Sequence, residues 1–158
     1  MKHKPVIIIA IVLFTFIILL GYLAFNWNNR HITQYIQVTE CQIAMTSCTV
    51  ELDKKTSIQV NILPRGIPES STLSISVNTE GLPIDEASVI FEGVEIDTLT
   101  PEYPLYQSDS TNFSGKGFLV ICSLSKMHWI AHIIIVKGGE VWRVSFPFEK
   151  TLNEAILQ

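Results

Sequence analysis

Basic side chains are missing from the middle of this 158-residue chain. No Lys or Arg occurs between Arg65 and Lys116, while the same stretch holds nine acidic residues. Nucleic acids and anionic lipid head groups are both bound through clusters of Lys and Arg. The sequence therefore argues against both as partners, and the acidic side chains indicate either a solvated surface or one that attracts cations.

The sequence also lacks the short motifs that mark common enzyme classes. It has no G-x-S-x-G nucleophile turn, no glycine-rich phosphate loop, no H-E-x-x-H zinc motif and no C-x-x-C redox motif. Glu92, Glu95 and Asp97 have the spacing of a strand edge, which does not suggest an acid and a base paired in a cleft. We therefore expect a protein that is not an enzyme.

Charge is missing altogether from residues 5–25, PVIIIAIVLFTFIILLGYLAF. As a helix this segment would be about 30 Å long, which matches the hydrocarbon core of a bilayer. A cleaved signal peptide would have a shorter apolar region and small residues at its cleavage site, where Tyr22 fits poorly. We expect a transmembrane helix in contact with the lipid bilayer, with Tyr22 and Trp27 at the membrane interface.

Flanking charge predicts the orientation of this helix. Lys2 and Lys4 precede the apolar segment and Arg30 follows it, so the N-terminus is expected in the cytoplasm. The part that follows the segment carries nine basic and 15 acidic residues, a net charge of −6. The expected organisation is a cytoplasmic tail (1–4), a transmembrane helix (5–25), a polar tether (26–40), a β-sandwich outside the cytoplasm (41–150) and a C-terminal tail (151–158).

After the tether, apolar and polar residues alternate with the period of two that is typical of β-strands. The sequence Lys-Gly-Gly-Glu at 137–140 predicts a hairpin because glycine tolerates positive φ, and 108–114 is expected to be a polar loop. Short strands at close spacing predict an all-β fold, an antiparallel immunoglobulin-like or cupredoxin-like sandwich preceded by one N-terminal transmembrane helix. The expected strands are 48–52, 57–63, 72–78, 87–93, 94–99, 116–122, 128–137 and 140–148.

Two of these segments, 118–122 and 130–136, are apolar on both faces. A strand that is covered on both sides has this pattern, and so has a strand that exposes one face to a partner. Core packing is the simpler interpretation. Docking of a partner through an apolar strand face is the alternative.

The chain has an odd number of cysteines, which are Cys41, Cys48 and Cys122. An exported domain meets oxidising conditions, so a disulfide is permitted and one thiol is left over. If residues 41–48 form a hairpin, Cys41 and Cys48 face each other and can form a bridge, which is the pairing that we favour slightly. Pairing of either cysteine with Cys122 stays open.

Cys122, Met127 and His128 lie close together in the segment CSLSKMH, between two predicted strands. Thiolate and thioether sulfur suit Cu(I), and imidazole suits copper as well. Blue-copper centres take Cys, His and Met from a loop of this kind, but the usual intervening His is missing here. The sequence therefore suggests a colourless Cu(I) site, with Met45 as a further candidate ligand, and Cu(I) is the only cofactor that it suggests. Core packing of Met127 and a structural role of Cys122 are the alternatives.

His132 is not expected to share a metal with His128. Four residues of a strand span about 13 Å, which is too far for one ion. The run of Ile and Val at 133–136 argues against a helix, in which the two side chains would meet. We therefore expect His132 to be partly buried and hydrogen-bonded.

Five spaced motifs lie along the chain after the tether. They are Cys41…Cys48, Leu63-Pro64, Phe91-Glu92-Gly93-Val94, Cys122…Met127-His128-Trp129 and Phe146-Pro147-Phe148. In their order and spacing the chain resembles a group of small bacterial inner-membrane proteins that have one N-terminal anchor and a periplasmic β-sandwich. The group is similar in layout to FixH-like and SCO-associated accessory proteins of cytochrome oxidase assembly. One difference is that Glu-Ile-Asp-Thr at 95–98 replaces the M-x-M-G of the group, which removes two thioethers.

The resemblance implies a single-pass protein of the bacterial inner membrane, with its N-terminus in the cytoplasm and its C-terminal domain in the periplasm. It implies a non-enzymatic accessory protein for respiratory oxidase assembly or Cu(I) handling, with a membrane or periplasmic protein as partner and no nucleic acid. The alternative, which follows from the residues themselves, is a metal-free interaction module of the envelope that docks a membrane partner through an apolar strand face.

Overall fold

The computed structural model describes residues 12–22, 31–69, 71–119 and 124–151 of the chain. The chain divides into two compact units, Met1–His31 and Ile32–Gln158.

In the first unit, residues 12–22 form a helix inside the predicted transmembrane segment. Among the described residues, no helix is both long enough and apolar enough to cross a bilayer. Tyr22 is 63% exposed at the end of this helix. The rest of the predicted segment 5–25 and Trp27 lie outside the described residues, as do the tail at 1–4 and most of the tail at 151–158.

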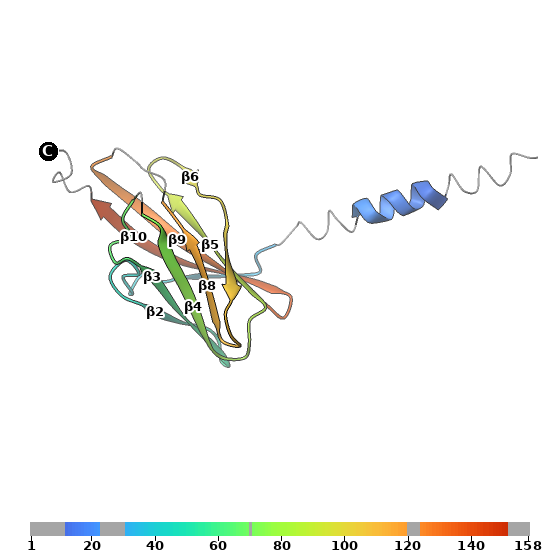
Figure 1. Ribbon diagram of the computed structural model, residues 1–158, viewed down its shortest axis with the longest axis horizontal. Helices are drawn as coiled ribbons and strands as arrows, with labels where there is room; N and C mark the ends of the chain where they lie inside the picture. The colour runs from blue at the N-terminus through green and yellow to red at the C-terminus, as the bar shows by residue number, and fades with distance from the viewer. Residues whose placement is uncertain (1–11, 23–30, 70, 120–123, 152–158) are drawn as a thin grey trace, which may run out of the picture. The chain divides into compact units, whose positions relative to one another are not determined.

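The second unit is built of β-strands, which confirms the all-β prediction (Figure 1). Neighbouring strands are antiparallel except for β1 and β10, which are parallel. In the described part of the chain the strands are β1 (Gln34–Gln37), β2 (Cys48–Asp53), β3 (Thr56–Leu63), β4 (Leu73–Gly81), β5 (Glu86–Gly93), β6 (Thr98–Leu99), β7 (Tyr103–Gln107), β8 (Asn112–Gly117), β9 (Lys126–Lys137) and β10 (Glu140–Thr151).

The strand order is β1-β10-β9-β5-β7-β8-β4-β3-β2, with β6 paired to β5 beside this path. β7 joins two halves of the sheet, because Tyr103 pairs with Val89 of β5 while Tyr106 pairs with Ser114 of β8. One half contains β1, β10, β9 and β5, and the other contains β8, β4, β3 and β2. The inward-facing side chains of both halves belong to one hydrophobic core.

The period-two pattern of the sequence explains this core. On β3, Ile58, Val60 and Ile62 are fully buried, and the residues between them are at least partly exposed. On β9 of the other half, Trp129 and Ile133 are also fully buried. Each such side chain stabilises the fold by roughly 1.5–3 kcal/mol through the apolar surface that it removes from water.

β9 is covered on both faces, as the core-packing interpretation expects. Its inward residues Ala131, Ile133 and Ile135 are fully buried, and its outward residues His132 and Ile134 are only 7% and 8% exposed. β9 lies between β5 and β10, whose side chains flank its outward face. The strand therefore offers little free apolar surface to a partner.

The other two-faced segment, 118–122, is not in a strand where it is described. The predicted strand 116–122 is shifted toward the N-terminus, since β8 spans Asn112–Gly117 and overlaps the predicted loop 108–114. Gly115 of β8 lies close to β7, and a Cβ at this position would lie 2.6 Å from the Pro104 carbonyl oxygen. A small residue is required here, and small residues do not suggest a strand in a sequence.

β1 also differs from the prediction, because it lies in the segment assigned to the tether. Its four residues pair with Trp142–Ser145 of β10. Among residues 31–40, only Ile36 and Val38 pack against the core, so the apolar pattern is weak. The β-domain therefore begins before residue 41.

The register defines two ends of the β-domain. At the entry end, Thr33 donates a hydrogen bond to the Val141 carbonyl (2.8 Å), close to the β9–β10 hairpin. An ion pair between Lys137 and Asp53 joins this hairpin to the β2–β3 turn. At the opposite end, here called the far end, β5, β8 and β10 finish while β4 and β9 begin.

Candidate functional site

Of the predicted copper ligands, the structure places Met127 and His128 on opposite faces of β9. Met127 faces inward and is 1% exposed, whereas the side chain of His128 faces outward and is 53% exposed. Consecutive residues of a strand point to opposite faces, so these two side chains cannot ligate one ion. Met45 is 65% exposed in the loop between β1 and β2, and Cys122 lies outside the described residues.

His128 is instead engaged by carboxylates. Its ring Nδ1 bonds Glu95, its backbone N–H donates to the second oxygen of Glu95 (2.8 Å), and Nε2 lies 3.6 Å from Glu149. The His128 side chain lowers the pKa of Glu95, and Lys126 lowers the pKa of Glu149. In the part of the chain that the structure describes, no group of three or more His, Cys, Asp or Glu side chains is arranged to hold a metal ion.

Cys41 and Cys48 form a disulfide, which is the pairing that the sequence favours slightly. The loop that it closes connects β1 and β2, the two ends of the strand order. Ile43 in this loop is fully buried, and the Ala44 carbonyl accepts a hydrogen bond from Gly66 (2.7 Å). The loop therefore fills the core at the far end, and the disulfide fixes its shape.

A polar cluster lies on the outward face of the half that contains β5, β9 and β10. His132 on β9 is the register partner of Ile90 on β5 and Ser145 on β10. Its Nε2 lies 2.7 Å from Glu92 and its Nδ1 lies 2.9 Å from the Ser145 hydroxyl. Both ring nitrogens are thus satisfied, as expected for a buried imidazole.

This cluster does not have the features of a hydrolase triad. A serine nucleophile needs N–H donors that are free to stabilise an oxyanion. Ser145 lies within β10, which pairs with β1 on one side and β9 on the other. We therefore assign His132 and Ser145 to holding the Glu92 carboxylate in place.

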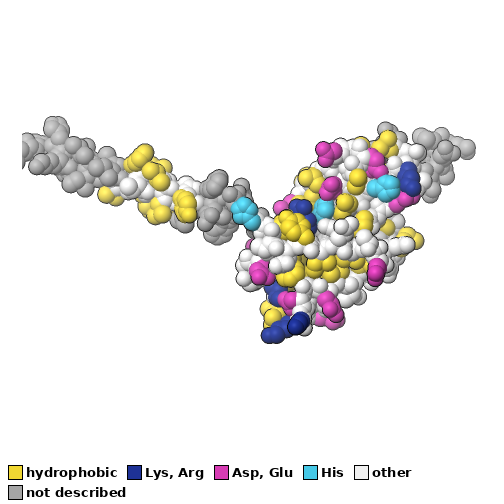
Figure 2. Space-filling view, turned by 180° about the vertical axis from the view of Figure 1, so that it is seen from behind, with side chains coloured by type: hydrophobic (Ala, Val, Ile, Leu, Met, Phe, Trp, Pro, Cys, Tyr) yellow, Lys and Arg dark blue, Asp and Glu magenta, His cyan; other side chains and the backbone are white. Residues whose placement is uncertain are grey.

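A hollow of about 150 Å³ lies beside this cluster. Arg143 is part of its wall, and its guanidinium carbon lies 5.8 Å from the centre of the Tyr35 ring. The Arg143 Nε is buried and has no hydrogen-bond partner among the described residues. On the face seen in Figure 2, charged and histidine side chains lie among hydrophobic ones. The residues that line the hollow are Ile90, Glu92, Asp97, Leu99, His132 and Arg143.

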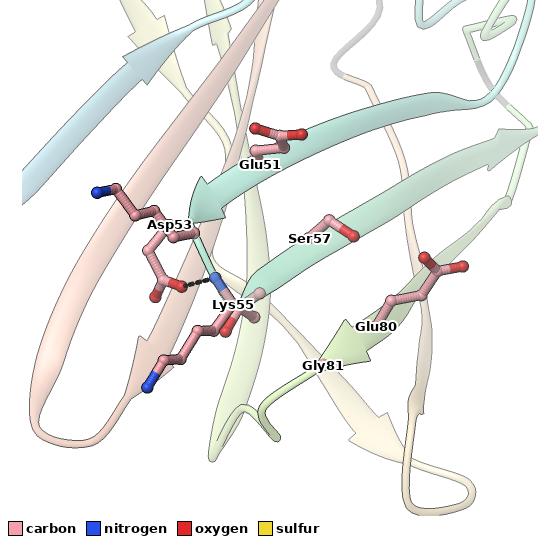
Figure 3. A pocket seen from close by; sticks show the side chains of 8 residues that line it. Glu51, Asp53, Lys55, Ser57, Glu80 and Gly81 are labelled. Carbon is pink, nitrogen blue, oxygen red and sulfur yellow. Dashed lines mark hydrogen bonds between the residues drawn. The ribbon is translucent and has the colours of Figure 1, made fainter.

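A second hollow lies at the entry end (Figure 3). It surrounds the β2–β3 turn, where Asp53 accepts a hydrogen bond from the Lys55 backbone (2.7 Å) and pairs with Lys137. The hydrogen bond from the Lys137 side chain is the largest cause of the lowered pKa of Asp53. These contacts stabilise the turn.

Exposed apolar side chains gather at the far end. In the described part of the β-domain, ten large hydrophobic side chains are at least 40% exposed, and seven of them lie at or next to this end. Three of the seven, Val94, Ile96 and Leu99, belong to the turn between β5 and β6 and to β6 itself. The seven, here called the far-end apolar surface, are Met45, Leu63, Val94, Ile96, Leu99, Phe118 and Leu124.

The sequence did not reveal the carboxylate partners of the two histidines. Glu92 and Glu95 looked like a solvated strand edge, but each meets a histidine that is at least 33 residues away. No pattern in the sequence indicated a role for Arg143. Knowledge of the strand register would have indicated that Glu92 lies near His132, because it places β5 beside β9.

The comparisons with known proteins add little. No family model matches the chain, and neither does any curated protein. Among solved structures, a crystal structure of a DUF4785 family protein from Legionella pneumophila subsp. pneumophila str. Philadelphia 1 is similar, with 13% sequence identity and a TM-score of 0.44. The match covers 63% of this chain and 29% of that protein, so the chain spans less than a third of the length of the structure it matches. A likeness at this level carries no conclusion about family or function.

Proposed function

We propose that this chain is a non-enzymatic accessory protein of the bacterial inner membrane that docks a membrane or periplasmic protein. Its N-terminal segment anchors it, and its β-domain, of the immunoglobulin-like or cupredoxin-like sandwich type, faces the periplasm. The resemblance to oxidase-assembly accessory proteins supports a partner from a respiratory complex.

The observation that carries this proposal is the far-end apolar surface. Exposed apolar side chains that concentrate on one part of a domain mark an interaction site more often than scattered ones do. They lie at the end opposite Thr33, where the chain enters the domain. Because Val94, Ile96 and Leu99 of this surface belong to the β5–β6 turn and to β6, the partner is expected to contact this turn.

Docking through the outward face of β9, which the sequence suggested, has less support because that face is largely buried. Cu(I) handling is not part of this proposal either. Met127 is buried in the core, and His128 is engaged by Glu95 and Glu149.

Photo-cross-linking in cells tests the proposal. A photoreactive amino acid replaces Val94 at the far end in the full chain, and Leu82 at the entry end in a control chain. The two side chains are 48% and 47% exposed, so exposure alone predicts equal labelling. We expect one discrete protein adduct from position 94 and none from position 82. That adduct should disappear when Phe118→Ser is added.

Equal adducts from both positions would contradict the proposal, and so would an adduct that Phe118→Ser does not change. A soluble marker enzyme that is fused to the C-terminus and active only in the periplasm checks the orientation. A fusion that is expressed at full length but has no marker activity would refute the periplasmic placement.

A further inference from the structure

We propose that the outward face of β3, β4 and β8 binds a neutral oligosaccharide. The register places the outward side chains of these strands in rows that run across the sheet. One row joins Asn61 of β3, Ser76 of β4 and Ser114 of β8, and Tyr106 of β7 pairs with Ser114. Opposite side chains of neighbouring strands have Cβ atoms about 5 Å apart, so the row is a continuous line of groups that one extended ligand can contact.

The centre of this face carries no charge. A second row lies beside the first, on its entry-end side, and consists of Thr49, Gln59, Asn78 and Asn112. Charged side chains appear only in the rows on either side of these two. They are Glu51 and Glu80 toward the entry end (Figure 3) and Lys116 toward the far end. A neutral polar surface suits a ligand that has many hydroxyl groups and no charge.

Side chains in the two neutral rows have free hydrogen-bonding groups. Among the described residues, Ser76, Asn78 and Ser114 make no side-chain hydrogen bond. The amide oxygen of Asn61 accepts from Arg65 (2.7 Å), which leaves the NH₂ donors of Asn61 for a ligand. Hydroxyl and amide groups can both donate and accept, as the hydroxyl groups of a sugar do.

A hollow of about 280 Å³ lies in this face, and Ser76 and Ser114 belong to its wall. Its volume is close to the ~300 Å³ at which pockets for small molecules begin, so one sugar ring has room in it. Leu63 supplies apolar surface to the wall, and Lys116 supplies donors that also bond neutral hydroxyls.

Tyr106 extends this site beyond the hollow. Its side chain is 71% exposed and stands next to Ser114, which lines the hollow. An aromatic ring offers a broad apolar surface, and the C–H face of a sugar ring can pack against it while the hydroxyls at the rim of the sugar meet polar groups. The hollow and Tyr106 together therefore match neighbouring rings of an oligosaccharide.

Calorimetric titration of the full chain tests the proposal, in micelles of a detergent that has no sugar head group. The probes are chitotriose and cellotriose, two neutral oligosaccharides that differ in their acetamide groups. We expect saturable binding of at least one of them. Tyr106→Ala removes the aromatic ring, and Ser76→Val removes a hydroxyl but keeps a residue that favours strands. Each variant should weaken the binding about 5- to 10-fold.

Tyr35→Ala is the matched control. Tyr35 is 70% exposed, almost the same as Tyr106, but it lies on β1 in the other half of the sheet. This variant should leave the affinity unchanged. Absence of saturable binding of either sugar up to about 10 mM would overturn the proposal. Unchanged affinity in both Tyr106→Ala and Ser76→Val would overturn the site, and so would an equal loss in Tyr35→Ala.

Discussion

Gly81 offers a sharp test of how the β2–β3 turn packs against β4. Its φ is +91°, and a Cβ at this position would lie 1.8 Å from the Lys55 carbonyl oxygen. The same oxygen accepts a hydrogen bond from the Leu82 backbone (3.2 Å). An alanine here must therefore adopt a strained φ and also push the turn away from β4, which breaks this hydrogen bond.

The cost of Gly81→Ala follows from these three effects. The positive φ costs roughly 1–2 kcal/mol for a residue with a Cβ. Displacing packed backbone costs roughly 1–3 kcal/mol, and the lost hydrogen bond roughly 0.5–1.5 kcal/mol. We expect the free energy of unfolding to fall by about 2.5–6.5 kcal/mol in all.

Gly138→Ala is the matched control, because Gly138 has a φ of +57° but a Cβ added there would meet no heavy atom within 4 Å. It should lose only the ~1–2 kcal/mol of the conformational strain. Alanine reduces the entropy of the unfolded chain in both variants, so this effect cancels in the comparison.

Urea-induced unfolding of fragment 32–158, followed by tryptophan fluorescence, measures both variants. The fragment contains the whole hydrophobic core, including Trp129. If the two variants lose stability within about 1 kcal/mol of each other, the contact between Gly81 and Lys55 is not what the structure indicates.

Three further predictions use the same fragment. Reduction of the Cys41–Cys48 disulfide, whose cysteines are seven residues apart, should lower stability by about 2–3 kcal/mol, and an unchanged urea midpoint with reductant would refute this. The hydrogen bonds from His128 hold the pKa of Glu95 below its usual 4.5, so the unfolded state takes up a proton first as the pH falls. The stabilisation from Glu95 is therefore present above the usual pKa and lost below it, and Glu95→Gln should make the acid-side fall in stability less steep in urea unfolding at several pH values. Met127→Ala should cost about 2–5 kcal/mol and Met127→Leu less than about 1.5 kcal/mol, whereas equal melting temperatures would contradict the burial of this side chain.

The fold was predictable wherever a strand buries one face. β3 and β4 have a strict period of two, and their predicted bounds differ from the observed ones by a few residues at most. β7 and β8 were missed or shifted because Pro104, Gly115 and Gly117 obscure the alternation. Close contact between backbones selects such residues, and a single sequence does not reveal which backbones will meet.

The candidate sites were harder to predict, since their residues come from strands that are distant in the sequence. The sequence placed Met127 and His128 together as neighbours in the chain, but a strand sends them to opposite faces. It treated Glu92 as solvated, although the register of β5 and β9 pairs it with His132. Adjacency across strands is decided by topology, which local patterns determine only weakly.

The placement of β1 determines how the β-domain responds to tension on its N-terminal side. Force on Ile32 is carried first by the short ladder between β1 and β10, from the Thr33–Val141 bond to the Val38–Ser145 bond. Peeling this ladder releases chain only as far as Cys41, which is cross-linked to Cys48 at the start of β2. The roughly nine residues from 32 to 41 extend by at most about 30 Å. Beyond that length the load passes through the disulfide into β2 and the core, so the domain has a limited extension before its packed part is strained.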